Sequence, residues 1–181
     1  AGLLNAALAW RLGRLLLGPA VGLVWAALMA CQWTFVFFEG TLQDAWLLVT
    51  LLLVLMLLLH SFAVTPSAPR AAAAAATAGL VALVRPNMLV VLPLLAVWGW
   101  WVTVRHQRQP RLPALAAAAA ALALVLAPST LRNLRVEGRW VPVSANGGLT
   151  LYVGNNDAAT GVSSSEVTGL GRFATVWEVP E

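Results

Sequence analysis

The sequence predicts an all-α polytopic membrane protein, a helical bundle of about six apolar segments, with a small α/β or β-hairpin-containing tail outside the bilayer. Two observations lead to this fold class. Sixty per cent of the residues are hydrophobic and 10% are charged, whereas about 25% are charged in an average soluble domain. Residues 15–38 and 45–69 also carry no formal charge, and each stretch exceeds the ~20 residues that cross a ~30 Å hydrocarbon layer.

Charge divides the chain near Pro128. Nine charged residues lie within residues 1–128, and nine more lie within the 53 residues from Ser129 onward. We therefore expect a transmembrane region over 1–128 and an extracytoplasmic segment over 129–181.

Charged connections separate the apolar segments, which we place at residues 1–10, 18–38, 45–63, 71–84, 87–104 and 113–128. Arginine gathers in the first, third and fifth connections, which face the cytoplasm by the positive-inside rule. The connections that hold Glu39, Asp44 and Arg85 then lie on the opposite side, together with the tail. Three arginines that follow the last span closely count against this orientation.

The sequence Arg85-Pro86-Asn87 is the candidate turn between the fourth and fifth segments. Proline removes a backbone donor and disfavours helical geometry in the residue before it. The fourth segment has only 14 residues, or ~21 Å of helix. The fourth segment could therefore cross the bilayer fully, or it could form a re-entrant pair of helices with the fifth segment inside the bundle. The sequence leaves both arrangements open.

The tail has the pattern of a hairpin. Residues 140–144 and 149–153 are two short extended runs, joined by an Asn146-Gly147-Gly148 turn that accepts positive φ. A second turn follows at residues 154–157. The tail is too small to bury much core by itself, so we expect it to pack on other extramembrane parts.

Composition excludes several other classes. The basic residues form short clusters and no continuous stripe, so nucleic-acid binding is not expected. Cys31 is the single cysteine, which leaves no disulfide framework or zinc site. All eleven basic residues are arginine, and alanine runs are long, which favours a bacterial source. Because the chain opens without Met or a charged leader, we expect an internal fragment of a longer protein.

Few residues in the membrane region could carry chemistry. Glu39 and Asp44 are its only acidic residues, and a carboxylate there could act as a general base, orient a sugar hydroxyl or bind a metal. Their alternative role is a solvated connection between helices. Arg85 could present its planar donor fork to a phosphate near the interface, or it could pair with Glu39 or Asp44 or extend toward lipid headgroups.

Arg132 and Asn133 emerge directly after the last span, together with Arg135. Lipid phosphates lie at that depth, so these side chains could hold a lipid-linked anionic substrate. Nonspecific headgroup contact is the alternative.

Several motifs, taken in order, resemble the membrane core of bacterial GT-C glycosyltransferases, in particular protein O-mannosyltransferases and aminoarabinose transferases. The membrane motifs are NAALAWRLGRLLLG at 5–18, FFEGTLQD at 37–44 and LVRPN at 83–87. The tail motifs are PSTLRN at 128–133, VSANGG at 143–148 and GNN at 154–156.

This resemblance implies a GT-C fold that transfers a sugar from a polyprenyl-phosphate donor to a lipid, glycan or protein acceptor at the outer face of the inner membrane. It implies that the principal catalytic aspartate lies upstream of this chain. Glu39 or Asp44 would match an acidic position in the family's second outer loop. The motifs also assign substrate binding to Asn87, Asn146 and Asn155. The motifs identify no cofactor. They leave open whether a divalent metal takes part.

Two other functions fit the same pattern. Outward-facing charges near a broken helix pair also suit a polytopic transporter, and a polymer-export subunit without chemistry is a further alternative. The transferase accounts best for a structured outer tail.

Overall fold

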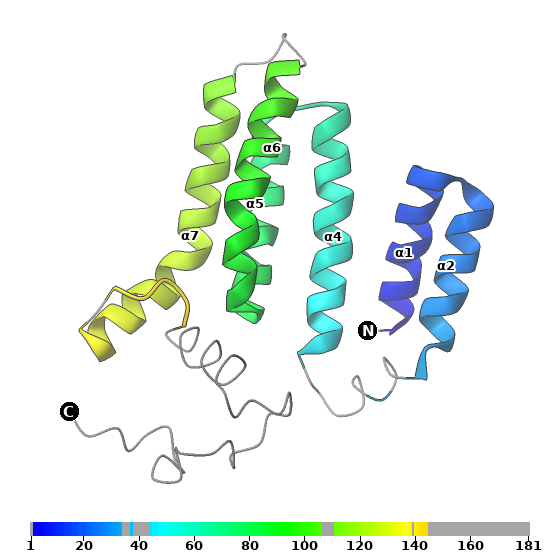
Figure 1. The fold of residues 1–181 in the computed structure, drawn as a ribbon, viewed down its shortest axis with the longest axis horizontal. Helices are drawn as coiled ribbons and strands as arrows, with labels where there is room; N and C mark the ends of the chain where they lie inside the picture. The colour runs from blue at the N-terminus through cyan, green and yellow to red at the C-terminus, as the bar shows by residue number, and fades with distance from the viewer. Residues whose placement is uncertain (1, 34–36, 38–43, 106–110, 139, 145–181) are drawn as a thin grey trace, which may run out of the picture. The chain divides into compact units, whose positions relative to one another are not determined.

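The computed structural model of this chain describes residues 2–33, 37, 44–105, 111–138 and 140–144, and its regular elements there are all helical (Figure 1). They are α1 (Gly2–Leu17), α2 (Pro19–Cys31), α4 (Ala45–Val64), α5 (Ala68–Val84), the 3-10 helix η1 (Pro86–Val90), α6 (Val91–Arg105) and α7 (Arg111–Glu137).

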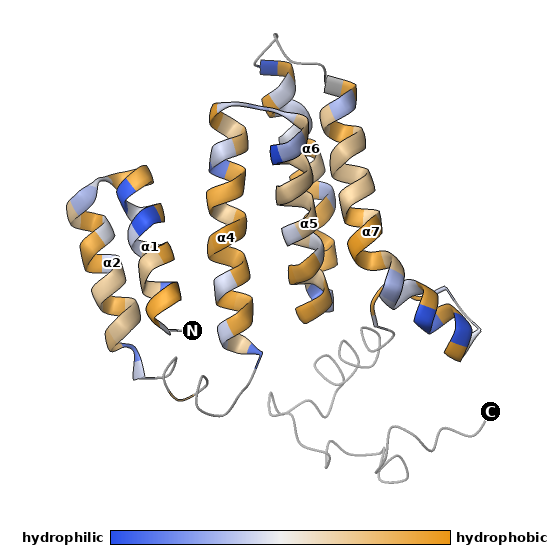
Figure 2. Ribbon diagram, turned by 180° about the vertical axis from the view of Figure 1, so that it is seen from behind, coloured by the Kyte–Doolittle hydropathy of each residue, from blue (hydrophilic) through white to orange (hydrophobic). Residues whose placement is uncertain are grey.

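Within the described residues, three helical stretches are long and apolar enough to cross a membrane, at Ala45–Val64, Pro86–Arg105 and Leu112–Val136. Figure 2 shows apolar residues along these helices, with hydrophilic residues nearer their ends. The prediction of a helical membrane protein is confirmed at this level. The apolar helices α2 and α5 are shorter, and the count of six segments stays a prediction.

The helices α4, α5, η1 and α6 pack around one apolar cluster. Leu92 of α6 packs against this cluster, which contains Val81 of α5, whereas Val102 lies about three turns later in α6 and packs with Ala71 near the start of α5. The helix α6 therefore runs back along α5, and the turn predicted at Arg85-Pro86-Asn87 is confirmed.

The helices α1 and α2 form a tight antiparallel pair around two glycines. A Cβ atom built on Gly22 would lie 2.6 Å from the backbone oxygen of Trp10, and one built on Gly13 would lie 2.8 Å from the Cα of Gly22. Gly18 allows the reversal between the helices, because its φ of 103° is one that L side chains rarely adopt. Small residues thus bring these two backbones together, as they do in membrane helix pairs.

The contacts between helices sort their ends into two groups. Asn5 of α1 contacts Thr50 of α4, and Asp44 at the start of α4 contacts Arg85 at the end of α5. The start of α4 and the end of α5 therefore lie at the same end of the bundle. We call it the Asp44 end. The opposite end holds Arg70 and the last turn of α6, and we call it the Arg70 end.

This arrangement agrees with the charge pattern in the sequence. Arg14 in the last turn of α1 and Arg105 in the last turn of α6 lie toward the Arg70 end. Their guanidinium groups lie over the rings of Trp10 and Trp101, each 5.3 Å from a ring centroid. Which end faces the cytoplasm stays a prediction from the positive-inside rule.

Several predicted boundaries differ from the structure. The charge pattern predicts a first segment at 1–10, but α1 continues through Arg11 and Arg14 to Leu17, because arginine is a good helix former and the first backbone break is Gly18. The same pattern predicts a second segment at 18–38, but α2 ends at Cys31 and has 13 residues.

The last helix also differs from its predicted bounds of 113–128. It begins at Arg111 and continues past Pro128 to Glu137. The compact unit that contains all these helices ends at Val143, and a second unit covers residues 144–181. The first run of the predicted hairpin, residues 140–144, has no regular secondary structure. The rest of the hairpin and its following turn lie outside the described residues.

The glycine contact between α1 and α2 leads to a stability prediction. We expect Gly22→Ala to destabilise the protein by about 1–3 kcal/mol, because its Cβ would meet backbone atoms that cannot rotate away. The free energy of unfolding in detergent micelles measures this effect.

Gly99→Ala is the matched control. A Cβ on this helical glycine would have nothing within 4 Å, and alanine is the better helix former. Equal effects of the two substitutions would contradict the close approach at Gly22.

Candidate functional site

Arg85 is held at the Asp44 end by its own backbone. Its N–H donates to the carbonyl of Val81 at 2.9 Å, and its carbonyl accepts from the N–H of Met88 at 2.9 Å. Its φ of −133° and ψ of 97° are extended, as the following proline requires. This backbone position is therefore fixed between α5 and η1, while the side chain is exposed.

The guanidinium of Arg85 pairs with Asp44. Its Nη2 donates to Oδ1 of Asp44 at 3.1 Å, and the two side chains are 48% and 47% exposed. The carboxylate of Asp44 makes no cap hydrogen bond to α4. It accepts instead from Arg85, at the end of another helix. The pairing that the sequence left open for Arg85 is thus present with Asp44.

A half-exposed pair joined by one hydrogen bond keeps most of its binding capacity. A guanidinium has five N–H donors and a carboxylate has about four acceptor positions. The contact uses one of each, so Arg85 can still bind an anion and Asp44 can still accept from a hydroxyl. Exposed pairs of this kind contribute only about 0.2–1 kcal/mol. A ligand can therefore displace the contact at little cost.

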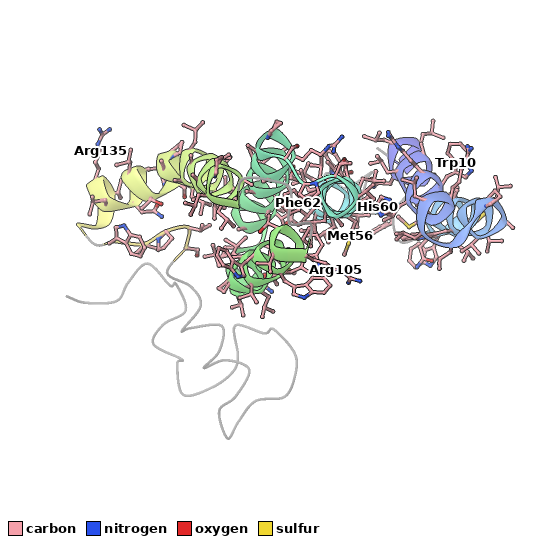
Figure 3. All side chains as sticks on the ribbon, turned by 90° about the horizontal axis from the view of Figure 1, so that it is seen from above. Trp10, Met56, His60, Phe62, Arg105 and Arg135 are labelled. Atoms are coloured by element: carbon pink, nitrogen blue, oxygen red, sulfur yellow. The ribbon has the colours of Figure 1, made fainter. Side chains whose placement is uncertain are left out.

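An apolar cavity of about 370 Å³ lies between α4, α5, α6 and α7. Every lining residue is apolar, including Phe62 of α4, Ala78 of α5, Trp98 of α6 and Leu122 of α7. Phe62 and Trp98 contact each other with ring centroids 6.2 Å apart, and Figure 3 shows Phe62 among these helices. The cavity reaches Ala78 of α5. Arg85, which caps this helix, follows seven residues later, or ~10 Å along the axis.

The other predicted site residues are more scattered. Asn87 is exposed in η1, two residues after Arg85, and Arg132 is exposed on α7. Among the described residues no contact joins Arg132 to Asp44 or Arg85. Glu39, Asn146 and Asn155 lie outside the described residues.

Asn133 has a contact that the sequence did not predict. Its side-chain amide donates to the carbonyls of Val141 at 3.1 Å and Val143 at 3.0 Å, and the residue is 7% exposed. The hydroxyl of Thr130 lies 2.9 Å from the carbonyl of Pro142. These bonds hold the first residues after α7 against its last turns. Both amide hydrogens of Asn133 are used in this way, so only its carbonyl oxygen has capacity for a substrate.

A buried polar contact between α1 and α4 was also missed. The hydroxyl of Thr50 lies 2.6 Å from Oδ1 of Asn5, which is 5% exposed. The same hydroxyl lies 2.9 Å from the carbonyl of Trp46. A lone Asn within an apolar run is the signal that could have indicated this contact, because such residues bond across helices in lipid.

These contacts satisfy the polar groups inside the bundle. Among the described residues, every buried side-chain nitrogen or oxygen has a hydrogen-bond partner. Within the same residues, no three His, Cys, Asp or Glu side chains form a group that could hold a metal ion. The polar groups with remaining binding capacity therefore lie at exposed positions such as Arg85 and Asp44.

Comparison with known proteins returned no match to a family model, a curated protein or a solved structure. The resemblance to GT-C enzymes thus depends on the motifs alone.

The bond between Asn5 and Thr50 leads to a second prediction. We expect Thr50→Val to lower the free energy of unfolding by about 0.6 kcal/mol, the average for an interhelical hydrogen bond in a membrane protein. Unfolding of the purified protein in detergent measures the change.

Thr77→Val is its control, since the hydroxyl of Thr77 bonds only to the carbonyl of Ala73 in its own helix. A loss at Thr77 as large as that at Thr50 would show that the Asn5 bond adds nothing.

The contact of Asn133 with the following residues leads to a third prediction. We expect Asn133→Ala to speed elastase cleavage after Val143 at least about fivefold, because each lost hydrogen bond is worth ~1 kcal/mol of local stability. Asn87→Ala removes an exposed amide in η1 and should leave the cleavage rate unchanged. Unaltered cleavage in the Asn133 variant would contradict the contact.

Proposed function

We propose that this chain is the membrane-embedded part of a glycosyltransferase. It moves a sugar from a polyprenyl-phosphate donor to a glycan, lipid or protein acceptor at the outer face of a bacterial inner membrane. One observation carries the proposal: a half-exposed arginine stands at the Asp44 end, ~10 Å along α5 from an entirely apolar cavity. The order of the sequence motifs supports the same reading.

The donor has two parts with opposite requirements. Its polyprenyl chain is apolar and needs a surface inside the hydrocarbon layer, and the cavity offers such a surface, lined by Ala78, Leu92 and Leu122 among others. Its phosphate is charged and needs a cation at the interface. A phosphate bound by Arg85 would leave the first part of the prenyl chain to run down α5 toward the cavity.

Arginine suits this phosphate because its fork matches two oxygens at once. Arg85 also stands at the C-terminus of α5, where the helix dipole favours a positive charge. Its single bond to Asp44 places it without using all its donors. Asn87 lies beside it in η1 and can donate its amide to the same phosphate or to the sugar.

In the transfer step the acceptor hydroxyl attacks the sugar carbon that bears the phosphate. A carbon–oxygen bond to the acceptor forms, the bond to the phosphate oxygen breaks, and the hydroxyl proton passes to a base. Arg85 stabilises the negative charge that develops on the leaving phosphate. Asp44 or Glu39 orients the acceptor hydroxyl, and the principal base is the aspartate expected upstream.

We expect Arg85→Ala in the full-length protein to lower transfer at least about a hundredfold, the usual cost of one charge-stabilising donor. Arg85→Lys keeps the charge but not the fork, so it should retain part of the activity. The assay supplies radiolabelled polyprenyl-phosphate sugars to the protein in lipid nanodiscs and measures the labelled product.

Arg70→Ala is the matched control. It removes an arginine from the same helix at its opposite end, where Nη1 of Arg70 donates to the carbonyl of Thr65, and it should leave transfer intact. Normal turnover by the Arg85→Ala protein would contradict the assignment of Arg85. Movement of an intact sugar substrate across the membrane by the wild-type protein, with no transfer, would favour a transporter instead.

A further inference from the structure

The last turns of α7 differ from the rest of the helix. Pro128 lies inside α7 and removes the hydrogen bond that its N–H would make one turn earlier. Figure 1 shows α7 bending toward its C-terminal end. We call residues 129–137, with Trp140 beyond them, the α7 extension.

Large apolar side chains of the α7 extension are exposed. The exposed fractions are 52% for Leu131, 44% for Leu134, 70% for Val136 and 72% for Trp140. Two arginines, Arg132 and Arg135, are exposed in the same turns, and Figure 3 shows the side chain of Arg135 extending away from the ribbon. A surface of this kind, with mixed leucine, tryptophan and arginine, is typical of segments that lie at a membrane interface.

The bonds of Thr130 and Asn133 decide which face is free. Both side chains hold the returning residues 141–143, so that face of the extension is covered by the chain itself. At 100° per residue, Arg132 and Arg135 project from the opposite side of the helix. The face that carries the two arginines is therefore the one open to a partner.

The length of α7 places this face at the headgroups. The apolar stretch Leu112–Val136 has 25 residues, which is longer than the ~20 residues that cross a ~30 Å hydrocarbon layer. About 20 residues counted from Leu112 end near Leu131, so the hydrocarbon layer ends there. Arg132 and Arg135 then fall at the depth of the lipid phosphates.

We propose that the α7 extension docks on the headgroup layer at the Asp44 end of the bundle, with Arg132 and Arg135 binding the phosphates of anionic phospholipids. Charge complementarity and the continuity of the extension with a membrane-crossing helix identify lipid as the partner. Its apolar side chains enter the layer beside the phosphates, while Thr130 and Asn133 keep the following chain on the side away from the arginines. This surface is independent of the donor site proposed at Arg85.

A fluorescent label tests the docking in the full-length protein. The background protein carries Cys31→Ala and has no other cysteine. The substitution Val136→Cys then introduces one cysteine, which is labelled with the environment-sensitive fluorophore NBD. The protein is placed in nanodiscs of phosphatidylcholine with or without phosphatidylglycerol, and with lipids brominated near the headgroup as quenchers. We expect blue-shifted emission, quenching by the brominated lipids, and stronger quenching when phosphatidylglycerol is present.

The arginine variants separate charge from apolar contact. Arg132→Gln and Arg135→Gln should each lower the docking constant in phosphatidylglycerol roughly fivefold, the effect of one basic residue near an anionic surface. Both side chains are exposed, so the fold tolerates these changes. Arg70→Gln changes an arginine at the opposite end and should leave the signal unchanged.

Three outcomes would overturn the proposal. Emission typical of water would show that the α7 extension does not dock. Blue-shifted emission without quenching by brominated lipid would show that a protein surface covers it. Loss of the phosphatidylglycerol effect on addition of inorganic phosphate would show a site for free phosphate.

Discussion

The hydrocarbon layer contains no water, and this constraint shapes the helices that the structure describes. A polar group inside it must find a partner within the protein or lie at one of the two interfaces. The buried side chain of Asn5 follows the first course, because its Oδ1 accepts a hydrogen bond from Thr50 of the neighbouring helix. Arginines and the acid Asp44 follow the second course and lie at the helix ends. The interior is therefore left with small and apolar side chains, and the polar groups free to bind a ligand gather at the surface of the bundle.

This separation produces the candidate site. Apolar residues from four helices leave a cavity between them, and the backbone break before Pro86 fixes Arg85 at the end of one of those helices. An apolar chain with a charged head matches both features at once. The pairing with Asp44 is exposed and weak, so it can hold the guanidinium in place and still give way to a phosphate. In the α7 extension beyond Pro128, apolar and basic side chains share one short helix, which is the basis for our proposal that it docks at the interface.

Part of this structure was predictable from local pattern. Uncharged stretches predicted α4 to within a residue at its end, and the proline at 86 predicted the turn, because both depend on neighbours in the sequence. Charge position was a poorer guide to helix ends: α1 continues past Arg11, since arginine does not break a helix. The partners of Asn5 and Asn133 could not be assigned, because they depend on which helices meet. For Arg85, the sequence named Asp44 as one possible partner, and only packing decided between that pairing and the others.

We propose that one lipid-linked anion occupies the cavity with its apolar chain and binds Arg85 with its phosphate. Photo-crosslinking of the full-length protein with a polyprenyl phosphate that carries a photoreactive group in its prenyl chain tests this most directly. We expect labelled peptides from the cavity walls of α5, α6 and α7, with labelling reduced by unlabelled polyprenyl phosphate and by Arg85→Ala. Labelling confined to α1 and α2, or labelling that the Arg85 variant leaves unchanged, would contradict it.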